Sequence, residues 1–546
     1  MNYKKYRKSP VIDYPERQWP NKQLKAAPKW CSVDLRDGNQ SLVTPFTMEQ
    51  KLDFFQFLVK VGFKEIEVGF PAAAEGEFLF VRKLIEENLI PDDVTIQVLT
   101  QSREPLIRKT FESLAGAKNA TVHLYNATSP LFREVVFKRT KEETIRLAVE
   151  GAELFNKLVD ESGYSFEYSP ECFSQTEPDF VVDVCNAVIS CWQGRQIIIN
   201  LPFTVESHTP NVHADMVEYV LARLKDRENI TISLHAHNDR GTAVAATELC
   251  LLAGADRVEG TLFGNGERTG NADIITLAMN LYSQGIDPGL DFSDIDDAIS
   301  LYTDSTCLPV HPRHPYVGEL VYTAFSGSHQ DAIRKGMANL KDGDIWDMPY
   351  LPIDPKDVGR GYDPIIRVNS QSGSSSVAYI LETKHELPKL PKAMQRDFGL
   401  VVTNISDTQA AELTPDDIYS LFRKTYVNVD TPMGFVGKQS LTQAGEIYTV
   451  VCTVQLNGKE VLIEGKGRGP MDAFRQGLLP LCNINFDIGI YSQQTLNVNE
   501  GAEAPAISYI EIIINGKSYF GAGISRSTTN SSLKAIVSAL NRYLKV

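Results

Sequence analysis

The sequence lacks the features of several specialised classes of protein. No apolar run approaches the roughly 18 residues that a membrane-spanning helix needs, and no apolar segment follows the basic start from Met1 to Lys8. The eight cysteines include no Cys-x-x-Cys pair, so we expect reduced thiols and no zinc or disulfide framework. The formal charge of −15 argues against a nucleic acid or an anionic membrane as the main partner. We therefore expect a soluble, cytoplasmic protein.

The sequence does have enough apolar residues for more than one core. Its 546 residues, 43% of them hydrophobic, predict about two to four domains. Short apolar runs recur in the first half of the chain, separated by stretches of helix length. These runs are Trp30 to Leu35, Ile66 to Phe70, Thr95 to Leu99, Thr121 to Tyr125, Phe166 to Tyr168, Ile197 to Leu201, Ile230 to Leu234 and Val258 to Phe263.

Helix start signals fall between these apolar runs. Capping boxes occur at residues 47–50, 140–143 and 174–177. Strands that alternate with helices predict an α/β fold of parallel βα units, and eight such units predict a closed (β/α)₈ barrel over residues 29–290. An open doubly wound sheet is the alternative. It would carry a glycine-rich dinucleotide turn after its first strand, and residues 37–40 (Asp-Gly-Asn-Gln) are not one.

The rest of the chain shows two further patterns. We expect an N-terminal arm over residues 1–28 and a helical linker region over residues 291–428. The linker helices are predicted around residues 294–302, 328–339, 393–398 and 415–424. Over residues 429–546 an Asn-Gly turn, a Gly-x-Gly segment and a helix pattern occur twice, at 457–479 and at 515–544. We interpret this as an internal duplication of strands joined by a hairpin turn, a Gly-x-Gly turn and a helix.

Polar residues lie where the strands of the predicted barrel end. His235 and His237 follow the seventh apolar run at a spacing of two, so on a strand they point the same way. Asp37 follows the first run and Asn271 the eighth, and these strands become neighbours when the barrel closes. Imidazole, carboxylate and amide ligands predict a site for a divalent ion, Mg²⁺ or Mn²⁺ by its oxygens, with Zn²⁺ also admitted. A lone His-x-His is more often an ordinary core or surface pair.

Other strand ends offer groups for catalysis. Arg36 can bind a carboxylate or an oxyanion, or it can pair with a carboxylate of the barrel. Ser169 and Thr204 offer hydroxyls for a substrate, or they cap the ends of strands. Glu171, after the fifth run, is a candidate general base. His329 begins a predicted helix outside the barrel and, on sequence alone, is a surface residue.

Several motifs in order resemble the 2-isopropylmalate synthase family. They are Asp34 to Gln40, Glu67 to Pro71, Glu167 to Glu171, Leu234 to Gly241 and Gly264 to Asn271. The longer form of that family also resembles this chain at Pro349 to Arg360 and in the duplicated C-terminal region. The resemblance therefore runs from about residue 28 to the end.

The resemblance implies an activity and a set of partners. The family condenses acetyl-CoA with 3-methyl-2-oxobutanoate to give 2-isopropylmalate and CoA, the first committed step to leucine. The resemblance further implies a divalent metal, a homodimer, and a C-terminal domain that binds leucine as a feedback effector. At 468, an arginine replaces an asparagine common in the family, which bears on that effector site.

The resemblance also assigns roles to individual residues. Asp37, His235, His237 and Asn271 would hold the metal, and Arg36 would stabilise the developing alkoxide. Substrate binding falls to Leu99, His123, Ser169 and Thr204. Proton abstraction from the acetyl group falls to Glu171, His329 and Tyr362, with His329 supplied by the partner subunit. The alternatives are a related synthase acting on pyruvate or 2-oxoglutarate, a carbon-carbon lyase on the same barrel, and an inactive metal-dependent amino-acid sensor.

Overall fold

The computed structural model describes residues 12–159, 163–192, 194–323, 327–341, 343–360, 374–409, 413–496 and 504–545. The chain divides into two compact units. We call the first the barrel unit; it extends to Val321 and includes Asp354–Arg360. The C-terminal unit comprises Tyr322–Ile353 and the chain from Gly361 onward. No helix in the described part of the chain combines the length and the apolar character of a membrane span.

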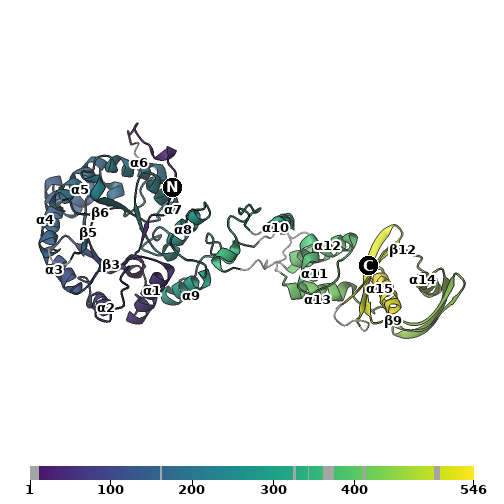
Figure 1. Ribbon diagram of the computed structural model, residues 1–546. Helices are drawn as coiled ribbons and strands as arrows, with labels where there is room; N and C mark the ends of the chain where they lie inside the picture. The colour runs from purple at the N-terminus through teal and green to yellow at the C-terminus, as the bar shows by residue number, and fades with distance from the viewer. Residues whose placement is uncertain are drawn as a thin grey trace. The chain divides into compact units, whose positions relative to one another are not determined.

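Parallel strands close into a barrel in chain order, which Figure 1 shows nearly end-on. They are β1 (Lys29–Ser32), β2 (Glu65–Gly69), β3 (Thr95–Gln101), β4 (Ala120–Ala127), β5 (Ser165–Glu171), β6 (Ile197–Phe203), β7 (Ile230–Ala236) and β8 (Arg257–Gly260). Each predicted apolar run contributes one strand, so the (β/α)₈ prediction is confirmed. β5 is longer than its apolar run, and it carries Ser169 and Glu171 on the strand itself.

Helices surround the barrel between its strands (Figure 1). They are α1 (Met48–Val61), α2 (Glu75–Glu86), α3 (Glu104–Ser113), α4 (Lys141–Val159), α5 (Pro178–Trp192), α6 (Pro210–Leu221), α7 (Ala243–Leu252) and α8 (Ile274–Tyr282), followed by α9 (Ile295–Thr306). The capping boxes at Thr47 and Thr140 are confirmed. The one predicted at Ser174 is wrong, because its hydroxyl donates to the carbonyl of Val205 and α5 begins only at Pro178.

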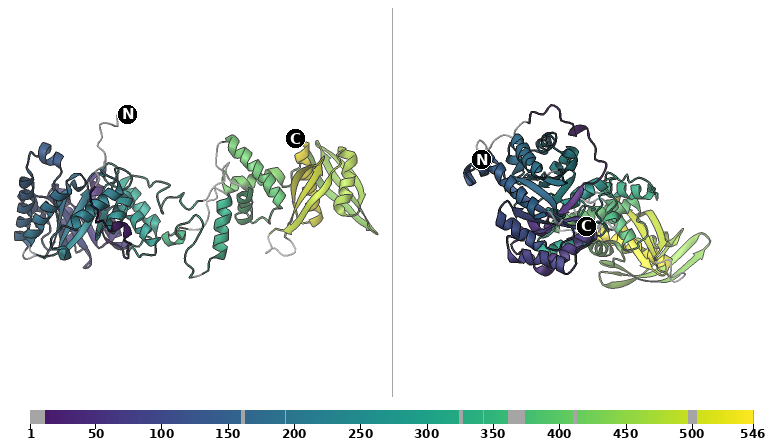
Figure 2. Two further views of the ribbon diagram at one scale, coloured as in Figure 1. Left: turned by 90° about the horizontal axis from the view of Figure 1, so that it is seen from above. Right: turned by 60° about the vertical axis from the view of Figure 1, so that its left-hand side comes forward.

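The C-terminal unit begins with the helices α10 (Gly327–Asn339), α11 (Ser374–Thr383), α12 (Lys392–Gln409) and α13 (Pro415–Tyr426). Three of these agree with the predicted helices, whereas α11 was not predicted, since its start is a run of serines that favours turns over helices. Aromatic residues of α12 and α13, Phe398 and Phe422 among them, share one buried core with Tyr509 and Phe520 of the following sheet region. These helices and that sheet therefore form one packed body (Figure 2).

The duplication is confirmed by two copies of a βββα unit. The first is β9 (Met433–Ala444), β10 (Ile447–Leu456), β11 (Lys459–Gly467) and α14 (Pro470–Cys482); the second is β12 (Asp487–Thr495), β13 (Ala506–Ile514), β14 (Lys517–Ser525) and α15 (Thr528–Leu544). Each copy forms an antiparallel three-stranded sheet. The Asn-Gly turns join β10 to β11 and β13 to β14, with Asn457 and Asn515 at positive φ as such hairpins require.

The Gly-x-Gly segments are not turns, and that prediction is wrong. Gly465 and Gly467 belong to β11, and Gly521 and Gly523 belong to β14. A Cβ at Gly465 would lie 2.0 Å from the carbonyl oxygen of Ala473 on α14. The glycines are therefore the positions at which each helix packs directly on its sheet.

Candidate metal centre and active site

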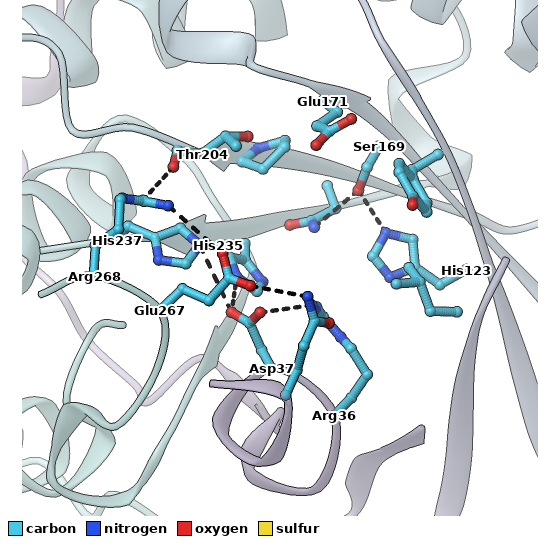
Figure 3. A pocket seen from close by; sticks show the side chains of 15 residues that line it. Arg36, Asp37, His123, Ser169, Glu171, Thr204, His235, His237, Glu267 and Arg268 are labelled. Carbon is cyan, nitrogen blue, oxygen red and sulfur yellow. Dashed lines mark hydrogen bonds and ion pairs between the residues drawn. The ribbon is translucent and has the colours of Figure 1, made fainter. Parts of the chain in front are cut away.

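A cavity of about 170 Å³ opens at the C-terminal ends of the barrel strands (Figure 3). Its lining consists of Arg36, Asp37, Gln40, Leu99, His123, Tyr125, Ser169, Glu171, Asn200, Pro202, Thr204, His235, His237, Glu267 and Arg268. The barrel residues predicted from the sequence all lie in this lining or, in the case of Asn271, in contact with it. Three loops that are distant in sequence therefore meet at one pocket, as the barrel register predicts.

The four predicted metal ligands lie together at one side of the pocket. Asp37 is presented by the tight turn after β1, and His235 by the end of β7. The Nε2 atoms of His235 and His237 lie 3.2 Å and 3.7 Å from Asp37 Oδ2. The Asn271 amide donates to the same oxygen at 2.7 Å, and a β-bridge joins Asn271 to His237.

Two buried atoms of this cluster have no hydrogen-bond partner in the described part of the chain, the side-chain oxygen Oδ1 of Asn271 and the ring nitrogen Nδ1 of His237. A buried polar atom left unpaired costs about 1–3 kcal/mol, so such atoms indicate a missing ligand or ion. Two imidazoles, one carboxylate and one amide oxygen are an N/O set that suits a divalent cation. The cluster therefore fits a divalent metal. The ligand atoms of Asp37, His235 and His237 lie within 4.8 Å of one another, close enough to bind one ion.

Arg36 is held by two carboxylates. Its Nη1 donates to Asp37 Oδ1 at 2.8 Å, and its Nε donates to Glu67 Oε1. Burial alone would raise the pKa of Asp37, but the Arg36 charge and the hydrogen bond with His235 outweigh it and hold that pKa well below its usual range. The ion-pair alternative for Arg36 is thus what the structure shows. The pairing also fixes the guanidinium at the edge of the pocket, where it can face a substrate.

The substrate side of the pocket is lined by β3 to β6. Ser169 Oγ lies 2.6 Å from His123 Nε2 and accepts a hydrogen bond from Asn200 at 3.0 Å. Thr204 Oγ1 accepts the backbone N–H of Cys172 at 2.9 Å, so it caps the strand end as the alternative for this residue predicts. Burial raises the pKa of Glu171, against the lowering effect of the Arg36 charge.

A second group of possible ligands, Glu67, His123 and Glu259, lies deeper in the barrel, with ligand atoms within 4.8 Å of one another. Glu67 Oε2 accepts from Gln97 at 2.7 Å and lies 2.8 Å from His123 Nδ1. Arg257 and Gln97 both donate to Glu259 Oε1 at 2.9 Å. Because protein donors already satisfy these carboxylates, the group is a buried ionic network.

Comparisons with known proteins agree with this geometry. The HMGL-like family model matches residues 27–301, the alpha-isopropylmalate synthase post-catalytic domain-like model residues 319–382, and the LeuA allosteric (dimerisation) domain model residues 412–544. A 2-isopropylmalate synthase of Acetoanaerobium sticklandii is 53% identical, covering 100% of this chain and 97% of the relative. That of Schizosaccharomyces pombe is 51% identical over 99% of this chain and 95% of the relative.

The chain belongs to the 2-isopropylmalate synthase family. The resemblance seen in the sequence motifs is thereby confirmed. A hydroxymethylglutaryl-CoA lyase structure from Pseudomonas aeruginosa is 19% identical, covers 53% of this chain and 97% of that chain, and has a TM-score of 0.45.

The structure does not test two residues that the family resemblance assigns to catalysis. His329 lies on α10 in the C-terminal unit, half-buried, with its ring stacked on Tyr350 at 4.0 Å between centroids. Tyr362 lies outside the described residues. The roles of both in this member of the 2-isopropylmalate synthase family stay predictions.

Sequence reasoning missed the charged layer beneath the pocket. Arg257 and Glu259 flank Val258 at the start of the eighth apolar run, so strand geometry points both charged side chains into the barrel. Gln97, on β3, lies in the same buried layer and donates to Glu259. The signal was present as a charge at period two inside a strand that is otherwise apolar, and it marks the layer that supports the family's site.

Proposed function

We propose that the chain condenses acetyl-CoA with 3-methyl-2-oxobutanoate, giving 2-isopropylmalate and CoA, the first committed step of leucine biosynthesis. The observation that carries the proposal is the convergence of Asp37, His235, His237 and Asn271, with two buried ligand atoms unpaired, in a chain about half identical to 2-isopropylmalate synthases over its full length. The cytoplasmic location predicted from the sequence is part of the proposal.

The proposed resident cation is Mg²⁺, with Mn²⁺ and Zn²⁺ as alternatives. The carboxylate of Asp37 and the amide oxygen of Asn271 favour the harder ions, while the two imidazoles also accept zinc. Asp37, Asn271, His235 and His237 would hold the cation. When bound, it would supply Lewis acidity to the carbonyl of the keto acid.

The proposed proton chemistry begins at Glu171. Its carboxylate takes a proton from the methyl group of acetyl-CoA, and the resulting carbon nucleophile attacks the keto carbon. Arg36, anchored by Asp37 and Glu67, faces the oxygen on which negative charge develops. The alkoxide takes up a proton and becomes the hydroxyl group of the product. Water then cleaves the thioester to a carboxylate, and CoA leaves as the free thiol. His329 and Tyr362 are proposed to assist the proton transfer, with His329 supplied by the partner subunit of a homodimer.

Substrate recognition is proposed to use the opposite wall of the pocket. The hydroxyl oxygen of Thr204 accepts a backbone N–H, which leaves its proton free to be donated to the keto-acid carboxylate. Leu99, His123 and Ser169 are proposed to surround the isopropyl group. The LeuA allosteric (dimerisation) domain matched at residues 412–544 supports both a homodimer and leucine as the effector.

The test is to incubate the purified full chain with acetyl-CoA, Mg²⁺ and a panel of 2-oxo acids and to follow the release of free thiol. We expect the fastest release with 3-methyl-2-oxobutanoate. Faster release with pyruvate or 2-oxoglutarate would assign a related synthase activity instead. The absence of thiol release with every acid would overturn the proposal in favour of a lyase or an inactive sensor.

A further inference from the structure

Glu259 contacts His235, one of the predicted metal ligands, at the ring nitrogen that does not face Asp37. Its Oε2 lies 2.7 Å from Nδ1 of His235. The two residues are direct register partners on the parallel strands β7 and β8, so the barrel itself builds this contact. Glu259 is completely buried, and His235 is only 5% exposed. Water therefore does not compete for the hydrogen bond.

The Glu259 carboxylate is fixed from several sides. Oε1 accepts from Arg257 Nη1 and from Gln97, each at 2.9 Å, and Oε2 also accepts from Asn200 at 3.2 Å. Arg257 is itself 0% exposed and donates to Ser233 and to the Gln97 side-chain oxygen, each at 2.8 Å. These hydrogen bonds prevent rotation of the Glu259 carboxylate and of the Arg257 guanidinium.

The consequence for His235 is a fixed tautomer. An ionised carboxylate accepts, so the proton of the neutral imidazole stays on Nδ1 and the lone pair is left on Nε2. Nε2 is the atom that lies 3.2 Å from Asp37 Oδ2, inside the ligand cluster. Glu259 already accepts hydrogen bonds from Arg257, Gln97 and Asn200, so it presents an acceptor oxygen to Nδ1 of His235.

We propose that Glu259, locked by Arg257, is a positioning residue that sets the tautomer and the direction of His235 for binding the divalent cation. The proposal rests on the candidate metal centre and deepens the proposed function. Such an outer carboxylate raises the basicity of its imidazole and lowers the entropy lost on binding, and removing one typically costs 10- to 100-fold in metal affinity. Glu259 itself touches no reacting group.

Glu167 supplies a matched control from the same buried layer. It is completely buried, and its Oε2 lies 3.2 Å from the same Arg257 guanidinium. Among the described residues, His235 included, neither of its side-chain oxygens has a hydrogen-bond partner. Glu167→Gln and Glu259→Gln are the same change of side chain, and each removes one carboxylate next to the Arg257 guanidinium. A general weakening of the buried layer would affect both variants.

The experiment measures binding of Mn²⁺ to the full chain without substrates, by the EPR signal of free Mn²⁺. We expect Glu259→Gln to bind Mn²⁺ about 10- to 100-fold more weakly than the unmodified chain, and Glu167→Gln to stay within about threefold. Thermal unfolding in EDTA shows whether each variant is folded. A purely structural role for Glu259 would lower the melting temperature and leave Mn²⁺ affinity equal to that of the control variant.

The outcomes separate this proposal from the proposed function. Equal Mn²⁺ affinity in Glu259→Gln and Glu167→Gln overturns the positioning role, whatever reaction the enzyme performs. Tight Mn²⁺ binding by the unmodified chain that is weakened by Glu259→Gln, together with no thiol release from any 2-oxo acid, supports the positioning role and overturns the proposed function. An unmodified chain that binds no Mn²⁺ overturns the metal centre and this proposal together.

Discussion

At the scale of single residues, His235 connects the candidate metal cluster with the charged layer beneath it. It has carboxylates on both ring nitrogens, Asp37 at one side and Glu259 at the other. Burial alone would lower the pKa of His235, but these two hydrogen bonds outweigh burial and raise that pKa to about 9. Protons and a divalent cation therefore compete for the same imidazole.

His235→Ala is expected to abolish thiol release and leave the protein folded. The substitution removes one ligand of the proposed cation, which would polarise the keto acid, while the barrel strands keep their backbone bonds. Thiol release measured across a magnesium titration checks the activity, and circular dichroism checks the fold. If the variant keeps full activity at low magnesium, the metal assignment is wrong.

His213 offers a residue-scale prediction about pH. It is 0% exposed on α6, its ring stacks on Phe203 at 4.1 Å, and neither ring nitrogen has a partner among the described residues. Burial first, then the charges of His208 and Arg240, lower the pKa of His213 to about 3. Below about pH 6.5, His213 binds a proton in the unfolded chain but not in the folded chain. The folded state therefore loses stability as the pH falls from about 6.5 toward 3.

His213→Phe should therefore stabilise the barrel unit, and more so in acid. Phenylalanine keeps the stack on Phe203 and removes two unpaired nitrogens. The advantage over histidine is expected to grow by about 1.4 kcal/mol between pH 7.5 and pH 5.5. Urea unfolding followed by the fluorescence of Trp30 and Trp192, both buried in the barrel unit, measures it. An advantage that does not change with pH would show that His213 takes up its proton in the folded state.

At the scale of elements, the sequence predicted best what a periodic apolar pattern controls. The eight strands follow from runs such as Ile230 to Leu234, and the ligand cluster follows from their closing order. Ser174 was misread because its hydroxyl found a carbonyl of another strand end, a tertiary contact that no local motif encodes. The glycines of β11 and β14 were misread because close packing of a helix and a tight turn both favour glycine.

The sharper test of the glycine interpretation is Gly523→Ala. A Cβ at Gly523 would lie 1.9 Å from the carbonyl oxygen of Ser531, so α15 must move away from β14. We expect a loss of about 1–3 kcal/mol in the stability of the second βββα copy. Hydrogen exchange of peptides from residues 506–544 measures the loss.

Gly437→Ala is the matched control, because a Cβ at Gly437 on β9 would meet no atom of the described residues within 4 Å. It is expected to change stability by no more than about 0.5 kcal/mol. Equal hydrogen exchange in the two variants would show that the Gly-x-Gly segments are ordinary strand positions.

At the scale of the whole molecule, the shared core limits how the chain can be divided. Phe422 and Tyr426 of α13 pack with Tyr509 and Phe520 of β13 and β14. A cut near residue 430 would remove one side of that core and leave the apolar surface of the helices exposed. The regulatory role of the duplicated region is therefore best tested in the full chain.

The last prediction is that millimolar leucine inhibits thiol release by the full chain, and that Arg468 tunes the response. Arg468 is exposed, next to the start of α14, where its backbone N–H donates to Asp472 at 3.0 Å. An exposed cation near a bound carboxylate contributes about 0.2–1 kcal/mol, so Arg468→Asn should raise the half-inhibiting leucine concentration by about 1.4- to 5-fold. The rate without leucine should not change, since Arg468 lies in the C-terminal unit. D-leucine serves as the control for ligand specificity, and an unmodified chain indifferent to leucine would overturn the regulatory role.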